Sequence, residues 1–169
     1  MDPLGHASIG LMVKPFAPKI PLWSLLAATQ IPDLLFFGFQ AAGIEHQAVT
    51  QFDLDHGLQY ISPPTIVWSH GLGMCIVWSI LLAVVAFLFC RDHRTSMILG
   101  LVLFSHWGLD SIVYPLMPVF FDNSQTIGLG LLTSVPGLIV SVILEIGLIV
   151  GGIAAYWMTR QQTALFAQK

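Results

Sequence analysis

Residues 66–90 read IVWSHGLGMCIVWSILLAVVAFLFC, a run of 25 residues without a lysine, arginine, aspartate or glutamate. A helix of that length measures about 37 Å at 1.5 Å per residue, which is enough to cross the roughly 30 Å hydrocarbon core of a bilayer. The apolar residues are continuous and do not alternate with polar ones, which disfavours a strand of a membrane barrel. The run therefore predicts a transmembrane helix.

Similar runs at 20–39, 97–120 and 135–158 predict three further spans. The 169-residue chain is 56% hydrophobic and only 9% charged, with a mean hydropathy of +0.81, whereas soluble domains are about 25% charged. We expect an all-α fold, a polytopic transmembrane helical bundle of about four spans in a single membrane-embedded domain, residues 1–169. Six basic residues against nine acidic ones exclude a nucleic-acid binder, and two cysteines exclude a disulfide scaffold.

The N-terminal segment Leu4–Val13 is apolar but too short to cross a membrane. Asp2 and Pro3 precede it and form a good N-cap and first-turn pair. We expect a short re-entrant half-helix whose N-terminus lies inside the bundle and whose other end, at Lys14, lies at the surface. Such a helix brings His6 about 12 Å inward from Lys14.

Basic residues predict the orientation of the spans, because cytoplasmic loops are enriched in lysine and arginine. In a four-span arrangement one side collects Lys14, Lys19, Arg91, Arg94, Arg160 and Lys169. The loops at 40–64 and 121–134 lack basic residues and hold Glu45, Asp53, Asp55 and Asp122. We therefore expect both termini to be cytoplasmic and the outer face to be acidic. We also expect a location in a bacterial-type inner membrane.

Ionisable side chains inside membrane spans cost several kcal/mol unless they pair, bind a ligand or face a cavity. The predicted spans contain Asp33, His70, His106, Asp110 and Glu145. His106 and Asp110 are four residues apart and share one helix face, where a metal ion can bind both side chains. The alternative is a hydrogen bond between the two, buried in the bundle.

The other ionisable residues also have two or more interpretations. Asp33 follows Pro32, which lacks an N–H and disfavours helix before it, so we expect the first span to break there. Asp33 is then either a ligand in a cavity or the N-cap of a second short helix. His70, near the outer end of its span, is either a ligand or an interfacial residue. Glu145 is central in the last span, where it is a ligand, a general base or a proton carrier.

Two surface patterns remain open as well. Gly147 and Gly151 form a small-xxx-small pair, which suits helix packing within one subunit or a homodimer. The outer-loop run at 53–56, Asp-Leu-Asp-His, is either a cation site or a solvated acidic turn.

In chain order, the polar motifs are Gly5-His6, Pro32-Asp33, Ser69-His70, Ser105-His106 followed by Asp110, and Glu145. This order resembles the YdjM-like family of membrane-bound metal-dependent hydrolases, in which Gly-His, Pro-Asp, Ser-His or Thr-His, and Ser-His-x-x-x-Asp recur on successive hydrophobic segments. It is also similar to the ligand order of zinc-dependent phospholipases C and their nuclease relatives. Many relatives continue Pro-Asp-x-Asp-His, whereas this chain has Leu34-Leu35-Phe36 after Asp33 and lacks that acid and histidine.

The resemblance implies a metal site with the ligands His6, Asp33, His70, His106 and Asp110, and with Asp33 and Glu145 as catalytic groups. Zinc is expected first for three histidines and two aspartates, and manganese or iron suit the same donors. The implied reaction is hydrolysis of a membrane lipid or a lipid-linked phosphate.

Two other classes of function compete with the hydrolase. A proton-coupled transporter working as a homodimer would use Glu145 as carrier and Gly147 with Gly151 as the seam between subunits. A non-catalytic membrane scaffold would bind no metal.

Overall fold

The structure, a computed structural model, describes residues 1–53, 55–122 and 124–166, with side chains as far as residue 161. The helices of this part are α1 (Pro3–Val13), α2 (Leu22–Ala41), α3 (Val67–His70), α4 (Leu72–Cys90), α5 (His93–Val113) and α6 (Val135–Phe166). Four of them, namely α2, α4, α5 and α6, are long and apolar enough to cross a membrane. The prediction of an all-α integral membrane bundle with four spans is therefore confirmed.

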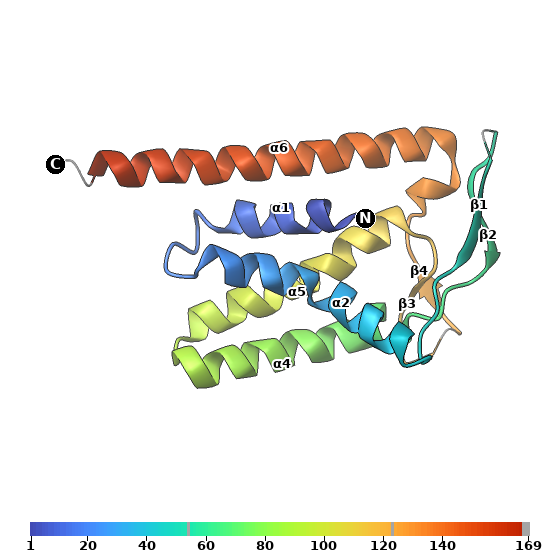
Figure 1. The fold of residues 1–169 in the computed structure, drawn as a ribbon, viewed down its shortest axis with the longest axis horizontal. Helices are drawn as coiled ribbons and strands as arrows, with labels where there is room; N and C mark the ends of the chain where they lie inside the picture. The colour runs from blue at the N-terminus through green and yellow to red at the C-terminus, as the bar shows by residue number, and fades with distance from the viewer. Residues whose placement is uncertain (54, 123, 167–169) are drawn as a thin grey trace.

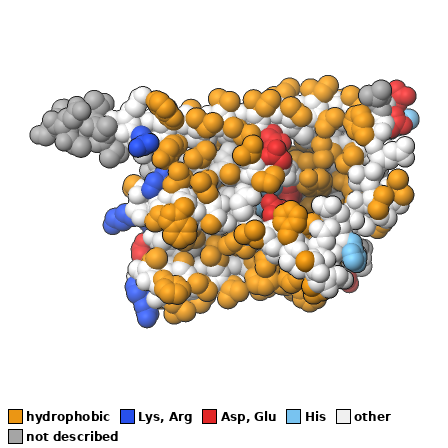
Figure 2. Space-filling model, in the orientation of Figure 1, with side chains coloured by type: hydrophobic (Ala, Val, Ile, Leu, Met, Phe, Trp, Pro, Cys, Tyr) orange, Lys and Arg blue, Asp and Glu red, His pale blue; other side chains and the backbone are white. Residues whose placement is uncertain are grey.

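Helices α6, α1 and α4 run along the long axis of the bundle, with α6 and α4 on opposite sides, whereas α2 and α5 are inclined to that axis (Figure 1). Between them lie α1, α2 and α5. The short helix α1 packs against α6, α2 and α5, and the N-terminus of the chain lies in the middle of the bundle. Most of the flank is hydrophobic, as Figure 2 shows, which is the surface expected of a protein surrounded by lipid.

The start of α1 follows from its first residues. The Asp2 carboxylate accepts hydrogen bonds from the backbone amides of Leu4 and Gly5, at 2.7 and 3.2 Å. Small residues then let α1 lie close to its neighbours: a Cβ added at Gly10 would come 3.1 Å from the backbone of Leu25, and one at Gly152 would come 2.8 Å from the carbonyl oxygen of Ser8. The expected half-helix inside the bundle is confirmed.

Gly147 and Gly151 on α6 face different surroundings. A Cβ added at Gly151 would lie 2.8 Å from the terminal methyl of Met12 on α1, whereas one at Gly147 would meet no described atom within 4 Å. Gly151 therefore packs within the chain and Gly147 faces outward. A homodimer seam at these glycines stays a prediction.

The opening run of 66–90 is not one continuous helix. It breaks at Gly71, which adopts an extended backbone (φ −66°, ψ 139°) between α3 and α4. A Cβ at Gly71 would collide with the carbonyl oxygen of Val67, so the close turn requires glycine. The break places His70 at the end of a short helix, inside the bundle.

The bounds of two other helices also differ from the predicted runs. Helix α5 begins at His93, with the Asp92 carboxylate accepting from the amides of Arg94 and Thr95, and it ends at Val113 instead of 120. It ends there because Pro115 disfavours helical geometry at Tyr114, which is extended. At the other end of the chain, α6 continues beyond 158 to Phe166.

The expected break at Pro32 is wrong, because α2 runs through it without interruption. Asp33 is consequently not an N-cap. A proline within a helix pushes the preceding turn open, and neighbouring groups can satisfy the backbone carbonyls that this exposes. Here the carbonyl oxygen of Thr29 accepts a hydrogen bond of 2.7 Å from Nδ1 of His106 on α5.

Two hairpins that the sequence analysis did not foresee cover one end of the bundle (Figure 1). The larger joins β1 (Val49–Asp53) and β2 (Gly57–Ser62) antiparallel, with Thr50 opposite Tyr60 and Phe52 opposite Leu58. The smaller joins β3 (Met117–Pro118) and β4 (Thr126–Ile127), and a 3-10 turn, η1 (Leu131–Thr133), leads into α6.

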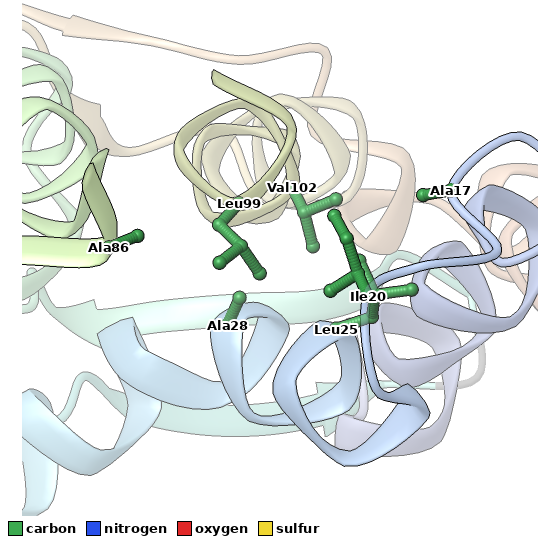
Figure 3. Packing of buried hydrophobic residues seen from close by; sticks show 7 residues of the cluster. All are labelled: Ala17, Ile20, Leu25, Ala28, Ala86, Leu99 and Val102. Atoms are coloured by element: carbon green, nitrogen blue, oxygen red, sulfur yellow. The ribbon is translucent and has the colours of Figure 1, made fainter. Parts of the chain in front are cut away.

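The opposite end of the bundle is closed by a cluster of packed apolar side chains (Figure 3). Its members are Ala17, Ile20, Leu25, Ala28, Ala86, Leu99 and Val102. Leu25 is fully buried, and Val102 is 3% exposed. The described lysines and arginines gather at this same end (Figure 2), whereas Lys169 lies outside the described residues. The chain thus has a basic end and a hairpin end, separated by the length of the spans.

Cysteine labelling tests the orientation. Cys90 is exposed and Cys75 is buried, so we would first replace Cys90 by serine. In that background, Gln51→Cys on the hairpin and Arg94→Cys at the basic end should react with a membrane-impermeant maleimide from opposite sides of the membrane. Both variants should react after permeabilisation, which is the control. Labelling of both from the same side would refute the topology.

Candidate metal centre

Five ionisable side chains from four helices meet in the interior. They are His6 on α1, Asp33 on α2, His70 at the end of α3, and His106 with Asp110 on α5. His6 and His106 are each 1% exposed, Asp110 3% and His70 8%. The Asp33 side chain is the most accessible of the set, at 25%. Residues separated by up to 104 positions in sequence are thus brought together at one buried site.

Asp110 is the residue that all three histidines approach. Its Oδ1 lies 3.2 Å from Nε2 of His6, and its Oδ2 lies 3.3 Å from Nε2 of His106 and 3.6 Å from Nε2 of His70. A metal ion shared by His6 and Asp110 requires their ligand atoms to lie within about 8 Å of each other, since zinc–ligand bonds are only about 2.0–2.2 Å long. The structure meets this condition.

Asp33 forms a second group with two of the same histidines. Its Oδ1 lies 3.5 Å from Nε2 of His70 and 3.6 Å from Nε2 of His106, and these two nitrogens are 3.2 Å apart. Two triplets of potential ligand atoms therefore overlap at His106, one with His6 and Asp110, the other with Asp33 and His70. The arrangement can hold one ion or two neighbouring ions.

Contacts at Nδ1 orient the rings of His106 and His70. Nδ1 of His106 donates to the carbonyl oxygen of Thr29, so a neutral His106 presents the lone pair of Nε2 to the carboxylates. Nδ1 of His70 lies 2.8 Å from the hydroxyl of Ser69. Histidines that bind metals commonly have their second nitrogen held in this way by a backbone or side-chain oxygen. The His6 ring stacks on that of His106, with centroids 3.6 Å apart.

The residues present fit a divalent cation. Asp110 is buried and Asp33 is half-buried, and such carboxylates are costly unless positive charge balances them. The ammonium group of Met1, 2.7 Å from Oδ1 of Asp110, supplies one positive charge for the two carboxylates, and neutral imidazoles supply none. Among the described residues, Nδ1 of the buried His6 has no hydrogen-bond partner, and Nε2 is not aligned for a hydrogen bond with Oδ1 of Asp110, which lies 3.2 Å away. A buried imidazole without such partners, next to carboxylates, is the environment expected of a metal ligand.

Glu145 is not among the converging atoms. It lies on α6 where that helix crosses the start of α1, and a Cβ added at Gly5 would come 3.1 Å from its Oε1. That oxygen has no hydrogen-bond partner among the described residues. The sequence motif grouped Glu145 with the five ligands, but the structure places it outside both triplets.

Asp53, Asp55 and His56 of the acidic run lie where the larger hairpin turns. The carboxylate of Asp53 accepts a hydrogen bond from the Asp55 amide at 2.7 Å and lies 3.1 Å from Nδ1 of His56. These bonds lower the pKa of Asp53, the bond from the Asp55 amide most strongly. Leu54 lies outside the described residues. The contacts favour the interpretation of this run as a solvated turn.

A cavity of about 440 Å³ lies between the five-residue cluster and the larger hairpin. Asp33, His70 and Asp110 line it on one side, and Thr50, Leu58 and Tyr60 of the hairpin on another. Its remaining wall is largely apolar and includes Phe36, Phe37, Leu116 and Met117. Figure 2 shows a hollow in the hydrophobic flank, toward the hairpin end, with acidic side chains beside it.

Sequence reasoning missed one buried acid altogether. Glu45 was assigned to an acidic outer face, but it is 1% exposed and its carboxylate accepts from the backbone amides of Trp68 and Ser69. Its partners are backbone groups more than 20 positions away, so no motif indicates them.

Comparison of the chain with protein-family models, curated proteins and solved structures finds no match. The resemblance to the YdjM-like hydrolases therefore rests on the ordered motifs of the sequence.

Proposed function

We propose that this protein is a membrane-embedded, metal-dependent hydrolase that cleaves a phosphoester of a lipid or a lipid-linked molecule. One observation carries the proposal: three histidines and two carboxylates have their ligand atoms close together, and three of these five residues, Asp33, His70 and Asp110, line a cavity of about 440 Å³. That volume is within the roughly 300–1,000 Å³ of ordinary small-molecule sites and suits a lipid headgroup.

Zinc is the metal we propose first. Imidazole nitrogen and carboxylate oxygen together are borderline donors that zinc prefers, and manganese or iron accept the same set. The residues that would hold the metal are His6, Asp33, His70, His106 and Asp110. When bound, such a metal makes a water molecule acidic enough to act as a nucleophile near neutral pH and polarises the phosphoryl group.

The protein's own groups would have separate tasks in this reaction. His70 and His106 are held in place by Ser69 and Thr29, so their ligand nitrogens are preorganised. The Asp33 carboxylate lines the cavity and has the greatest exposure of the five, so it is the group best able to accept a proton from water there. We give Glu145 no catalytic role, because it lies outside the cluster.

A membrane-derived substrate is favoured by the walls of the cavity. Phe36, Phe37 and Leu116 provide an apolar surface for an acyl or isoprenoid chain, and the hollow lies in the hydrophobic flank of the bundle (Figure 2). A phosphate at the head of such a chain can then reach His70 and Asp33.

One observation favours a second candidate, a proton-coupled transporter. Oε1 of Glu145 lies buried in a membrane span without a hydrogen-bond partner among the described residues. Intramembrane acids of this kind commonly carry protons. This candidate leaves the convergence of three histidines and two aspartates without a purpose.

Metal analysis of the detergent-purified protein tests the proposal. We expect about one or more equivalents of divalent metal per chain, zinc foremost, since the buried Asp110 and the half-buried Asp33 favour a bound cation. The metal-loaded protein should release phosphate-containing headgroups from phospholipids in mixed micelles, and chelator treatment should abolish the release. A chain that binds no divalent metal would overturn the hydrolase and leave the transporter and the scaffold.

A further inference from the structure

Glu45 is a buried carboxylate that the proposed reaction does not use. It lies in the connection between α2 and β1, is 1% exposed, and has no hydrogen-bond partner for Oε2 among the described residues. Its other oxygen, Oε1, accepts hydrogen bonds from the backbone amides of Trp68 at 2.7 Å and Ser69 at 3.0 Å. Burying a carboxylate that has only amide donors as partners costs free energy, so we ask what Glu45 does at this position.

The two amides belong to α3, the four-residue helix that ends in His70. The first amides of a helix have no partner within it, and Glu45 satisfies two of them. Ser69 then connects this contact to the metal centre, because its hydroxyl lies 2.8 Å from Nδ1 of His70. The opposite nitrogen of His70, Nε2, faces Asp33 and Asp110.

The backbone of Glu45 is attached to a second element of the site. The amides of Ile44 and Glu45 both donate to the carbonyl oxygen of Phe39 near the end of α2, at 2.9 and 3.3 Å. The next residue, His46, forms an antiparallel bridge with Thr65, just before α3. Glu45 therefore ties α2, which carries Asp33, to α3, which carries His70.

We infer that Glu45 is a positioning residue of the metal centre: through Ser69 it sets the orientation of His70, and through α2 it sets the spacing of His70 from Asp33. The inference rests on the proposed metal-binding function. Glu45 contacts neither the cavity nor the ligand atoms and acts only through its neighbours.

Cobalt binding provides the test, because Co²⁺ occupies zinc sites and its visible absorption reports the ligands around it. Glu45→Ala should weaken Co²⁺ affinity by about 10- to 100-fold, the usual loss when a partner behind a ligand is removed. Its cobalt spectrum should also change, because His70 is released. Glu45→Gln keeps an acceptor for both amides and should restore most of the affinity. Asp53→Ala is the matched control, since this exposed acid also accepts from a backbone amide, and it should leave affinity and spectrum unchanged.

A double mutant separates positioning from general destabilisation. If Glu45 acts through His70, Glu45→Ala should cause no further loss of Co²⁺ affinity in a His70→Ala background. The inference would be overturned if the fold-loss in Co²⁺ affinity of the double mutant equalled the product of the two single-mutant losses. It would also be overturned if Glu45→Ala had wild-type affinity and spectrum.

A second variant keeps the test decisive if Glu45→Ala does not fold. Should Glu45→Ala fail to fold, Ser69→Ala interrupts the same route while keeping the backbone contact, and it should weaken Co²⁺ binding by about tenfold or more. Wild-type binding by Ser69→Ala would then overturn the inference. A wild-type protein that binds no Co²⁺ would overturn the proposed function and the inference together, whereas the other contrary outcomes overturn the inference alone.

Discussion

His106→Ala and Asp110→Ala should each remove most of the bound metal. His106 belongs to both triplets of ligand atoms, and Asp110 is within 3.6 Å of all three histidine Nε2 atoms. Loss of a residue that only supports a ligand typically weakens metal binding by about 10- to 100-fold, so loss of a ligand should cost at least about 100-fold. Metal content of the purified variants, and their affinity in competition with a chromophoric chelator, measure the effect.

The controls for these variants are two histidines outside the cluster. His46 is exposed beside the hairpins, and His93 stacks on Phe87 at the start of α5. Replacing either by alanine should leave the metal content unchanged. Asp110→Asn keeps the shape of the side chain and guards against a folding defect in Asp110→Ala. Wild-type metal content in both His106→Ala and Asp110→Asn would show that the pair is a structural hydrogen bond.

Gly71→Ala should damage both the fold and the metal centre. Its Cβ would collide with the backbone carbonyl of Val67, and a backbone atom cannot move aside as a flexible side chain can. The junction of α3 and α4 must then shift, and His70 moves with it. We expect a loss of about 1–3 kcal/mol in stability, as for other strained or overpacked sites, and at least tenfold weaker metal binding. Thermal unfolding in detergent and chelator competition provide the two measurements.

Gly108→Ala is the matched control for this change. Gly108 lies on α5 between His106 and Asp110, and a Cβ there meets nothing within 4 Å. Alanine is preferred to glycine inside a helix by up to about 1 kcal/mol, so this variant should be as stable as the wild type or more so. Equal damage from both substitutions would show that the Gly71 turn is not the cause.

The spans and part of the site could be predicted because they depend on local patterns. Continuous apolar runs identify the four long helices, and the spacing of His106 and Asp110 places both on one face wherever the helix lies. The expected position of His6 followed from the length of α1 and its Asp-Pro start, together with the assumption that this short helix enters the bundle and does not lie flat on the membrane surface. These inferences require no knowledge of distant contacts.

The remaining features depend on partners that are far away in sequence. Pro32 does not break α2, and a carbonyl in the turn before it bonds to His106, 77 residues from Thr29. Glu45 resembles any acid of a solvated loop until α3 is seen to lie against it. The strands β1 (VTQFD) and β2 (GLQYIS) do not alternate strictly between apolar and polar residues, so the pattern that indicates a strand is absent. A glycine at position 71 is compatible with a helix break after His70, but the continuous apolar run around it favoured the prediction of one uninterrupted helix.

The apolar cluster of Figure 3 restricts access to the candidate metal centre to one end of the bundle. Along α2, Leu25 and Ala28 come before Asp33, and along α5, Leu99 and Val102 separate the basic end from His106. A hydrated divalent ion does not pass through packed hydrocarbon, whereas the cavity reaches the hairpin end. In the proposed enzyme, occupancy is therefore set by the free-metal concentration in the compartment that the hairpins face. If that compartment is the exterior, metal supply depends on the surroundings of the cell and is independent of the zinc buffering of the cytosol.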